Sequence, residues 1–416
     1  MKRKLLTQMR AEWRANVWMA IEMLLVSVVL FVLADKIYTA VATLNEPLGF
    51  DWEHCYILRV RELSDASPDY RQYDTQDDRY ADLLTLKQRL QARPEIEAVT
   101  MSSNAVPYNP NNSMIQLDID TFSMADAPLL VRRVDPDFFK VFRVEGANGQ
   151  SADELGEILQ RERIIPSDNV LRRKAGINTL KPLYGKQMVL SGTDTLTLRA
   201  SFKPMKYNDY GTIYGWAGAS MFERFHPSMM GFMEGLSVRV KDNMDNDFME
   251  HLMADADKEL RVGNWYIASI DSFKTIRKEY NRGSATETRN VVICALFLLV
   301  NIFLGILGTF WFRTQQRTRE IALRMVSGAT RLDIFRRILG EGQILLLLVT
   351  PVAIIIDYLL TIYEFTSWYD GFFEPVHFCV SVLAAWVLMA LMIAIGIYFP
   401  ARRAMSISPA VAMKTD

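Results

Sequence analysis

Long apolar runs, separated by polar and charged segments, dominate the pattern of this 416-residue chain. Each run holds about 17–22 residues, which as an α-helix is long enough to cross a hydrocarbon core of roughly 30 Å. The runs lack the alternation of barrel strands, and a lipid-exposed backbone must satisfy its own hydrogen bonds. The pattern therefore predicts four transmembrane helices, built on Val17–Leu33, Val291–Phe312, Ile344–Ile362 and Phe378–Phe399.

Basic residues gather on one side of these helices. The loop over residues 313–341 holds seven arginines, whereas residues 363–377 contain neither lysine nor arginine. Positive residues stay in the cytoplasm, so we expect both termini and residues 313–341 to be cytoplasmic. No small-residue cleavage pattern follows the first run, which favours a retained anchor over a signal peptide. These charges predict a multi-pass membrane protein with both termini in the cytoplasm.

The organisation that follows has one large segment outside the membrane. It comprises an amphipathic cytoplasmic segment 1–16, a first transmembrane helix 17–35, an extracytoplasmic domain 36–289, a second transmembrane helix 290–312, a cytoplasmic elbow 313–341, a third transmembrane helix 342–362, a short outer loop 363–377, a fourth transmembrane helix 378–399 and a cytoplasmic tail 400–416.

The extracytoplasmic domain has the mixed pattern of an α+β fold. Apolar spacing predicts helices over 78–93 and 245–259, and helical extensions that leave and re-enter the membrane at about 37–44 and 273–280. Alternating segments predict strands over 55–61, 97–102, 114–120, 129–134, 183–190, 195–202, 214–219 and 236–240. We expect mixed sub-domains, one inserted in another, with the two helical extensions forming a stalk.

Catalytic and metal-binding patterns are missing from the sequence. No phosphate loop of the Gly-x-x-x-x-Gly-Lys-Ser/Thr type occurs, so this chain is not expected to hydrolyse ATP itself. The four histidines are scattered, and no His-Glu-x-x-His or Gly-x-Ser-x-Gly motif is present. We therefore predict no catalytic residue, no metal site and no cofactor site in this chain. The cysteines Cys55, Cys294 and Cys379 predict no disulfide.

The elbow predicts two short helices around a glycine. Residues 313–326 should continue the second transmembrane helix, and Gly328 is suited to end it because glycine accepts a left-handed conformation. Thr330 can cap the next helix, with Asp333 three residues on as a capping box. An ordinary basic loop against lipid headgroups is one interpretation; a protein-docking knob is the other, and the two capped amphipathic pieces favour it.

The elbow sequence Arg317-Thr-Arg-Glu-Ile-Ala-Leu-Arg-Met-Val-Ser-Gly-Ala-Thr330, followed by Asp333 and Glu341, resembles the MacB/FtsX-like ABC permease family. The tail Pro400-Ala-Arg-Arg-Ala404 and Ser408-Pro-Ala-Val-Ala412 is similar to that family's C-terminal motif. Within the outer domain, Val134-Asp-Pro-Asp-Phe-Phe139 and Tyr184-Gly-Lys186 resemble two of its turns.

This resemblance implies a permease subunit that dimerises and recruits a cytoplasmic ABC ATPase, which would bind ATP and magnesium in place of this chain. ATP hydrolysis would move the periplasmic domain (mechanotransmission) for efflux of a periplasmic substrate, and a periplasmic adaptor or enzyme would be a further partner. Membrane lipids are expected neighbours and nucleic acid is not. The expected ATPase-coupling residues are Arg317, Arg319, Glu320, Arg324, Gly328, Ala329, Thr330 and Asp333.

A second hypothesis is an FtsX-like membrane regulator or scaffold that controls a periplasmic enzyme. Its docking surfaces would be the charged segment 155–173 and an asparagine-rich loop with Asn104, Asn109, Asn111 and Asn112. The sequence leaves the transported substrate, the role in export or regulation, and the homo- or heterodimeric state open.

Overall fold

The computed structural model describes residues 13–124, 127–213, 218–363, 365 and 373–406, which fall into two compact units. Among these residues, the membrane unit contains residues 13–42 and those from 286 onward, and the extramembrane unit contains residues 43–285. Most of the predicted amphipathic segment 1–16 and the second half of the tail motif, Ser408–Ala412, lie outside the described residues.

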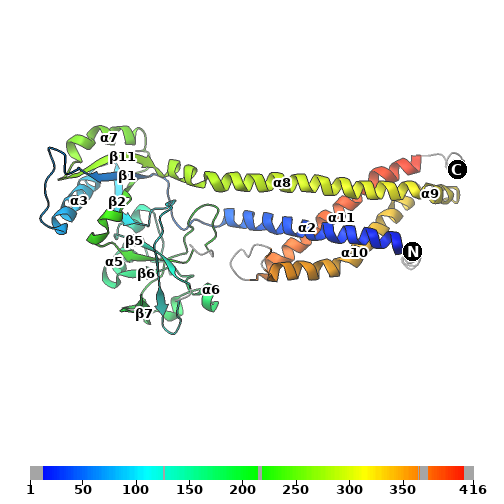
Figure 1. Ribbon diagram of the computed structural model, residues 1–416, viewed down its shortest axis with the longest axis horizontal. Helices are drawn as coiled ribbons and strands as arrows, with labels where there is room; N and C mark the ends of the chain where they lie inside the picture. Colours follow the sequence, from blue (N-terminus) through cyan, green and yellow to red (C-terminus); the bar gives the residue numbers. More distant parts are fainter. Residues whose placement is uncertain (1–12, 125–126, 214–217, 364, 366–372, 407–416) are drawn as a thin grey trace. The chain divides into compact units, whose positions relative to one another are not determined.

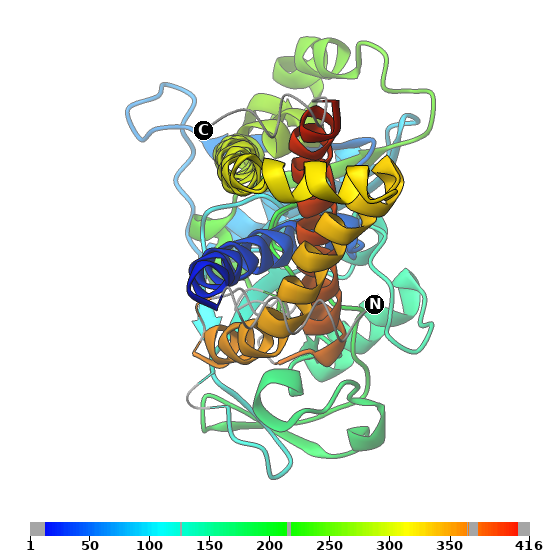
Figure 2. The same cartoon turned by 90° about the vertical axis from the view of Figure 1, so that its right-hand side faces the viewer.

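Four helices of the described chain are long and apolar enough to span a membrane, as predicted. They are α2 (Trp13–Asn45), α8 (Phe273–Gln316), α10 (Arg331–Ile362) and α11 (Pro375–Ser406). Within the membrane unit they share one apolar core, to which Phe31, Phe310, Leu346 and Met389 each contribute a buried side chain. Figures 1 and 2 show these helices and the short helix α9 (Thr318–Val326) that connects α8 to α10.

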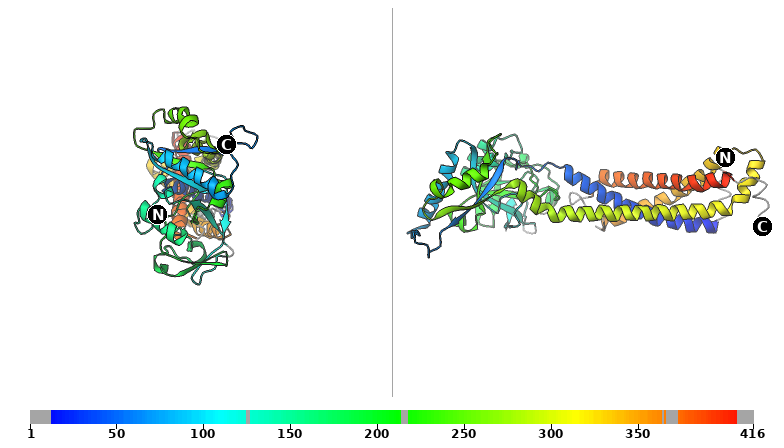
Figure 3. Two further views of the ribbon diagram at one scale, coloured as in Figure 1. Left: turned by 90° about the vertical axis from the view of Figure 1, so that its left-hand side faces the viewer. Right: turned by 90° about the horizontal axis from the view of Figure 1, so that it is seen from above.

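The predicted unbroken helix over 313–326 is wrong, because α8 ends at Gln316 and α9 begins at Thr318. Arg317 between them has φ −99° and ψ 9°, which leaves the α-helical region. The Thr318 hydroxyl donates to the carbonyl of Gln315 at 2.8 Å and so satisfies an acceptor at the end of α8. The helix after the break therefore takes a new direction, visible in Figures 2 and 3.

Two β-α-β units build one half of the extramembrane sheet (Figure 3, left). The first is β1 (Cys55–Glu62), α3 (Gln76–Gln91) and β2 (Ile96–Ser103); the second is β10 (Gly235–Val240), α7 (Phe248–Glu259) and β11 (Trp265–Ser272). The strand order is β11-β1-β10-β2, and neighbouring strands are antiparallel. Leu83 and Leu86 of α3 and Leu252 of α7 are buried in the same apolar cluster as Leu58 and Val238. Both helices therefore cover one face of this sheet.

The residues between β2 and β10 form the predicted insertion. Its elements are β3 (Met114–Ile115), β4 (Leu117–Ile119), β5 (Leu129–Val134), α4 (Phe138–Val141), α5 (Ala152–Glu162), β6 (Ile164–Pro166), α6 (Arg172–Ala175), η1 (Lys181–Leu183), β7 (Gln187–Leu190), β8 (Asp194–Thr197), β9 (Ser220–Arg224) and η2 (Pro227–Phe232). Strands β5, β9, β6 and β3 extend the large sheet, whereas β4, β7 and β8 make a separate three-stranded sheet.

Several strand predictions need correction. The predicted strand 114–120 is split at Gln116, because β3 pairs with β5 in the large sheet while β4 pairs with β7 in the small one. The predicted strands 183–190 and 195–202 form a hairpin but are shorter, as β7 at Gln187–Leu190 and β8 at Asp194–Thr197. Most of the predicted strand 214–219 lies outside the described residues, and β9 begins at Ser220. Strand β11, with exposed and half-buried positions beyond Ile267, was not predicted.

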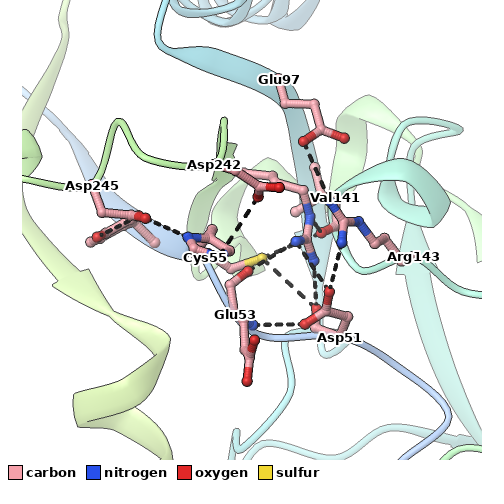
Figure 4. A network of polar contacts seen from close by, with 11 residues as sticks. Asp51, Glu53, Cys55, Glu97, Val141, Arg143, Asp242 and Asp245 are labelled. Carbon is pink, nitrogen blue, oxygen red and sulfur yellow. Dashed lines mark hydrogen bonds and ion pairs between the residues drawn. The ribbon is translucent and has the colours of Figure 1, made fainter.

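A buried arginine joins the insertion to the rest of the extramembrane unit. Arg239 of β10 is fully buried, and its guanidinium donates to the carbonyls of Val141, Glu53 and Asp51 at 2.6, 2.9 and 2.9 Å. Its Nη1 lies 3.3 Å from a carboxylate oxygen of Asp51, which also pairs with Arg143 (Figure 4). The planar fork of arginine reaches several acceptors at once, which offsets the cost of burying the charge.

Candidate functional site

The elbow between α8 and α10 is held by a small apolar contact of its own. Ile321 of α9 and Ile334 of α10 are both buried, with Met325, Ala329 and Ile338 packed against them. Ile321 and Met325 lie four positions apart on α9, as do Ile334 and Ile338 on α10, so each helix presents one apolar side to the other. Helices α9 and α10 therefore form a folded hairpin.

The turn between the two helices depends on Gly328, as predicted. Gly328 has φ +92°, a conformation that costs little for glycine and is strained for residues with a Cβ. Its N–H donates to the carbonyl of Met325 at 3.1 Å, and the N–H of Ala329 donates to the carbonyl of Arg324 at 3.0 Å. These bonds end α9 by satisfying its last carbonyls.

The predicted capping box begins α10. The Asp333 N–H donates to the Thr330 hydroxyl at 3.2 Å, and the Thr330 N–H donates to the Asp333 carboxylate at 3.1 Å. Two backbone donors that lack a helical partner are satisfied in this reciprocal way. The start of α10 is thus fixed one residue after the turn.

The Glu341 carboxylate forms ion pairs with two arginines at the inner side of the elbow. Arg317 Nη1 lies 2.6 Å from one carboxylate oxygen, and Arg337 Nε lies 3.5 Å from the other. Glu341 is buried, so these cations compensate a charge that would be costly to bury alone. Arg317 stands at the break between α8 and α9, so this ion pair ties the break to α10.

At the next residue of α10, Gly342, the elbow hairpin joins the helix bundle. A Cβ on Gly342 would lie 2.9 Å from Ile393 Cγ2 of α11 and 3.3 Å from Phe310 of α8. Only glycine lets α10 approach both helices this closely. Gln343 then donates to the carbonyl of Ala390 at 3.2 Å. Displacement of the elbow must therefore be accompanied by movement in the bundle or by loss of these contacts.

The outer side of the elbow exposes apolar and basic side chains together. Leu323 and Val326 of α9 and Leu332 of α10 are 56, 62 and 54% exposed. Arg319 of α9 and Arg331 of α10 are exposed too. An apolar patch rimmed by charge is typical of a surface that binds another protein.

Comparison with known proteins finds a family that includes the elbow region. Residues 292–409, which include the elbow, match the FtsX-like permease C-terminal family. The macrolide export ATP-binding/permease protein MacB of Escherichia coli is 27% identical over 186 residues, covering 44% of this chain and 28% of that protein. MacB of Vibrio parahaemolyticus is 25% identical over 331 residues, covering 79% of this chain and 47% of that protein.

The chain is similar to the MacB/FtsX-like ABC permeases. It spans less than half the length of these MacB relatives. Among solved structures, the periplasmic region of MacB from Actinobacillus actinomycetemcomitans aligns with 57% of this chain and 96% of that chain, at 11% identity and a TM-score of 0.32.

The predicted coupling residues of this permease divide into two groups. Arg317 faces Glu341, and Arg324 pairs with Glu320 at 2.6 Å on the same helix. The exposed group is Arg319, Gly328, Thr330 and Asp333, and Ala329 is half-buried. Their contact with an ATPase stays a prediction.

The sequence pattern did not predict the ion pairs of Glu341 or the exposure of Leu323 and Val326. Glu341 was noted only as part of the resemblance, yet it is the acceptor of both arginines. The available signal was an acid placed directly before the apolar run that begins at Ile344, where a charge needs a partner. Leu323 and Val326 were missed because exposed leucine and valine cannot be told from buried ones without the tertiary fold.

The permease has a second conspicuous site, a groove in the extramembrane unit. It is lined by Arg59, Val60, Arg61, Glu62, Arg79, Ser103, Asn104, Asn111, Asn112, Ser113, Arg133, Met229, Met230, Gly231, Phe232, Met233, Glu234 and Trp265. Its volume is about 980 Å³, in the range of sites that hold sizeable ligands. Three of the four asparagines of the predicted partner surface line it, and the fourth, Asn109, donates to Glu234 at 2.6 Å.

Glu234 lines this groove and joins the two ends of the insertion, because it lies just before β10 and contacts Asn104 just after β2. Its Oε1 accepts from the N–H of Asn104, just after β2, at 2.7 Å. Its Oε2 is buried and has no hydrogen-bond partner among the described residues. Burial raises the pKa of the Glu234 carboxyl to about 7. This residue is therefore partly protonated near neutral pH.

Proposed function

We propose that this chain is the permease subunit of an ABC transporter of the bacterial inner membrane. It couples ATP hydrolysis by a separate ATPase chain to motion of its periplasmic domain, for the export of a periplasmic substrate. Two copies, identical or different, form the membrane part. In this orientation both termini and the elbow are cytoplasmic, as the positive-inside rule favours.

The observation that best supports this function is the link between the two sides of the elbow. The outer side exposes Leu323, Val326 and Leu332 to a partner, while the inner side connects Arg317 to Glu341. A push on the outer side is opposed by a buried ion pair rather than absorbed by a loose loop. The elbow is therefore built to transmit a force from its exposed side to α10.

The helices supply the path along which such a movement would travel. Helix α8 runs from Phe273 to Gln316, and α2 runs from Trp13 to Asn45. Within the extramembrane unit, Phe273 is buried in the core beside Phe142, and Arg277 pairs with Asp209 at 2.7 Å. The start of α8 is therefore anchored in that domain, and a displacement of the helix would be felt there.

Co-purification with an ATPase is the first test of this function. The full-length chain, co-expressed with a candidate ABC ATPase, should be isolated with that ATPase and should change its rate of ATP hydrolysis. Gly328→Pro and Glu320→Arg should uncouple hydrolysis from movement of the periplasmic domain, because proline cannot adopt φ +92° and arginine at 320 repels Arg324. Unchanged coupling in both variants would remove the elbow from the mechanism.

A further inference from the structure

Strand β1 has an unpaired edge inside the sheet. It pairs with β11 along Tyr56–Glu62, but with β10 only along Cys55–Leu58. On the β10 side, the four residues Arg59–Glu62 have no strand partner in the described part of the chain. Unpaired N–H and C=O groups at such an edge are a template for another strand.

The gap begins where the chain enters β10 at Gly235. Here the chain returns from the insertion and enters β10 with φ +148°, and a Cβ would lie 2.3 Å from the carbonyl oxygen of Leu58. The residues before it turn away from β1 and form the opposite wall of the groove, where Arg59 Nη1 donates to the carbonyl of Glu234 at 3.4 Å. The edge of β1 is therefore left open by the way the insertion rejoins the sheet.

The groove lies along this open edge. Arg59, Val60, Arg61 and Glu62 all line it, although side chains of consecutive strand residues point to opposite faces. A cavity that meets all four of them must border the edge of the strand rather than one face. Four residues of strand extend over about 10 Å, from a rise of roughly 3.3 Å per residue.

The charge of the groove favours an acidic occupant. Four arginines line it against two acids, Glu62 and Glu234. Arg59, Arg79 and Arg133 each pair with a carboxylate, whereas Arg61 is exposed and has no ion pair among the described residues. A carboxylate of a bound segment could form an ion pair with Arg61.

Apolar side chains stand opposite the edge. Phe232 is 70% exposed, and Met229, Met230 and Met233 line the same wall. Methionine adapts to side chains of different shape, which suits the recognition of alternate side chains of an added strand.

We propose that this groove binds an extended acidic segment of another protein, which adds to β1 along Arg59–Glu62 as an extra strand. The backbone of the segment pairs with the open edge, its carboxylates meet Arg61 and the neighbouring arginines, and its apolar side chains lie on the methionine and Phe232 wall. The proposal holds whether the permease exports a substrate or regulates a partner enzyme.

The test uses the full-length permease in nanodiscs of zwitterionic lipid. The probe is a library of eight-residue peptides in which glutamate or aspartate alternates with valine, isoleucine or threonine, and binding is measured by fluorescence anisotropy. Two matched libraries carry lysine in place of the acids, or N-methyl groups on alternate amides, which remove strand hydrogen bonds while keeping the charge. Hydrogen–deuterium exchange locates the binding.

Acidic peptides should bind, and the amides of Arg59–Glu62 should exchange more slowly in their presence. Arg61→Glu should weaken binding about tenfold or more, because it places like charges together. Lys203→Glu, at an exposed lysine that pairs with Glu145 and does not line the groove, should leave binding unchanged. Phe232→Ser should weaken binding without affecting the fold, since this ring is largely exposed.

Three results would overturn the proposal. One is an absence of binding by every acidic peptide. Another is equal binding of the N-methylated library, which would mean that the groove takes an anion without strand pairing. The third is equal weakening by Arg61→Glu and Lys203→Glu, which would indicate non-specific attraction. None of these results depends on ATPase coupling, so they are distinct from a failure of the proposed function.

Discussion

Arg317 Nη1 lies 2.6 Å from Glu341 Oε2, and this contact bridges the break between α8 and α9 to the buried side of α10. The backbone leaves the α-helical region at Arg317. The ion pair of its side chain with Glu341 holds this point of the chain against α10. The residues on the outer side of the elbow can change direction as a body only if this pair moves with them or breaks.

Glu341→Ala should uncouple the permease and destabilise it. The substitution leaves Arg317 and Arg337 side by side without their shared carboxylate. Loss of one partner from a buried ion pair costs about 3–5 kcal/mol. We expect a lower thermal unfolding temperature in detergent and loss of ATPase stimulation. Glu157→Gln on α5, where the side chain is 70% exposed, is the control and should change neither. Normal coupling in Glu341→Ala would show that the ion pair is dispensable.

Gly328→Ala should cause no steric clash with other residues but should strain the backbone. A Cβ at this position meets nothing within 4 Å, so the cost is conformational alone. For an alanine at φ +92° we expect about 1–2 kcal/mol. Gly328→Asn should cost less, because asparagine adopts left-handed conformations more readily. Thermal unfolding of both variants should rank glycine, asparagine and alanine in that order, and a reversed order would contradict the turn described for the elbow.

Gly342→Val should disrupt the packing of α10 against α11, whereas Gly340→Val should not. Both glycines lie on α10, but a Cβ on Gly342 would be 2.9 Å from Ile393 Cγ2 and a Cβ on Gly340 would meet nothing within 4 Å. Overpacking of this kind costs about 1–3 kcal/mol. Thermal unfolding in one detergent compares the pair directly. Equal stability of the two variants would mean that the close approach at Gly342 is absent.

The extramembrane unit should lose stability as pH rises, and Glu234 should account for part of this loss. Burial raises the pKa of its carboxyl to about 7 from an ordinary 4.5, so the folded state holds the proton more tightly than the unfolded state. The resulting stabilisation is fully present below the ordinary pKa and is lost as pH rises through about 7. Unfolding temperatures measured between about pH 5 and pH 8 should therefore fall less steeply in Glu234→Gln than in the unaltered protein.

His54 acts in the same direction, so the difference between the two proteins is the informative quantity. The hydrogen bond from His54 to Asp245 raises the pKa of the imidazole. This contribution is present in both proteins and cancels in the comparison. Identical slopes for the unaltered protein and Glu234→Gln would contradict a buried, partly protonated Glu234.

Arg239→Lys should destabilise the extramembrane unit although it keeps the charge. Lysine cannot reach the carbonyls of Val141, Glu53 and Asp51 with one planar group. Hydrogen bonds made by a charged group contribute about 1.5–3 kcal/mol each, so a loss of at least one should be measurable. Arg224→Lys is the matched control, because that arginine is exposed and donates to one carbonyl, that of Gln160. Equal effects of the two substitutions would show that the buried network is unimportant.

Local sequence determined the features that depend on neighbouring residues. The apolar runs predicted four spanning helices, because lipid requires about 20 apolar residues in a backbone that satisfies itself. The turn at Gly328 and the Thr330–Asp333 capping box could also be predicted, because a turn and a helix start are set by residues only a few positions apart. The strands β1, β2, β5 and β10 followed from the alternation of apolar and polar residues.

Tertiary structure decided the features that depend on distant residues. Gln116 separates two strands because its flanks pair with different sheets, and no local pattern contains that information. Glu341 meets Arg317 from 24 positions away, and the groove brings Arg61 to the junctions of the insertion at Asn104 and Glu234. Local geometry is set by sterics and hydrogen bonds between neighbours, so the sequence displays it. Which charges become buried together depends on how the chain folds back, and only the packed molecule reveals it.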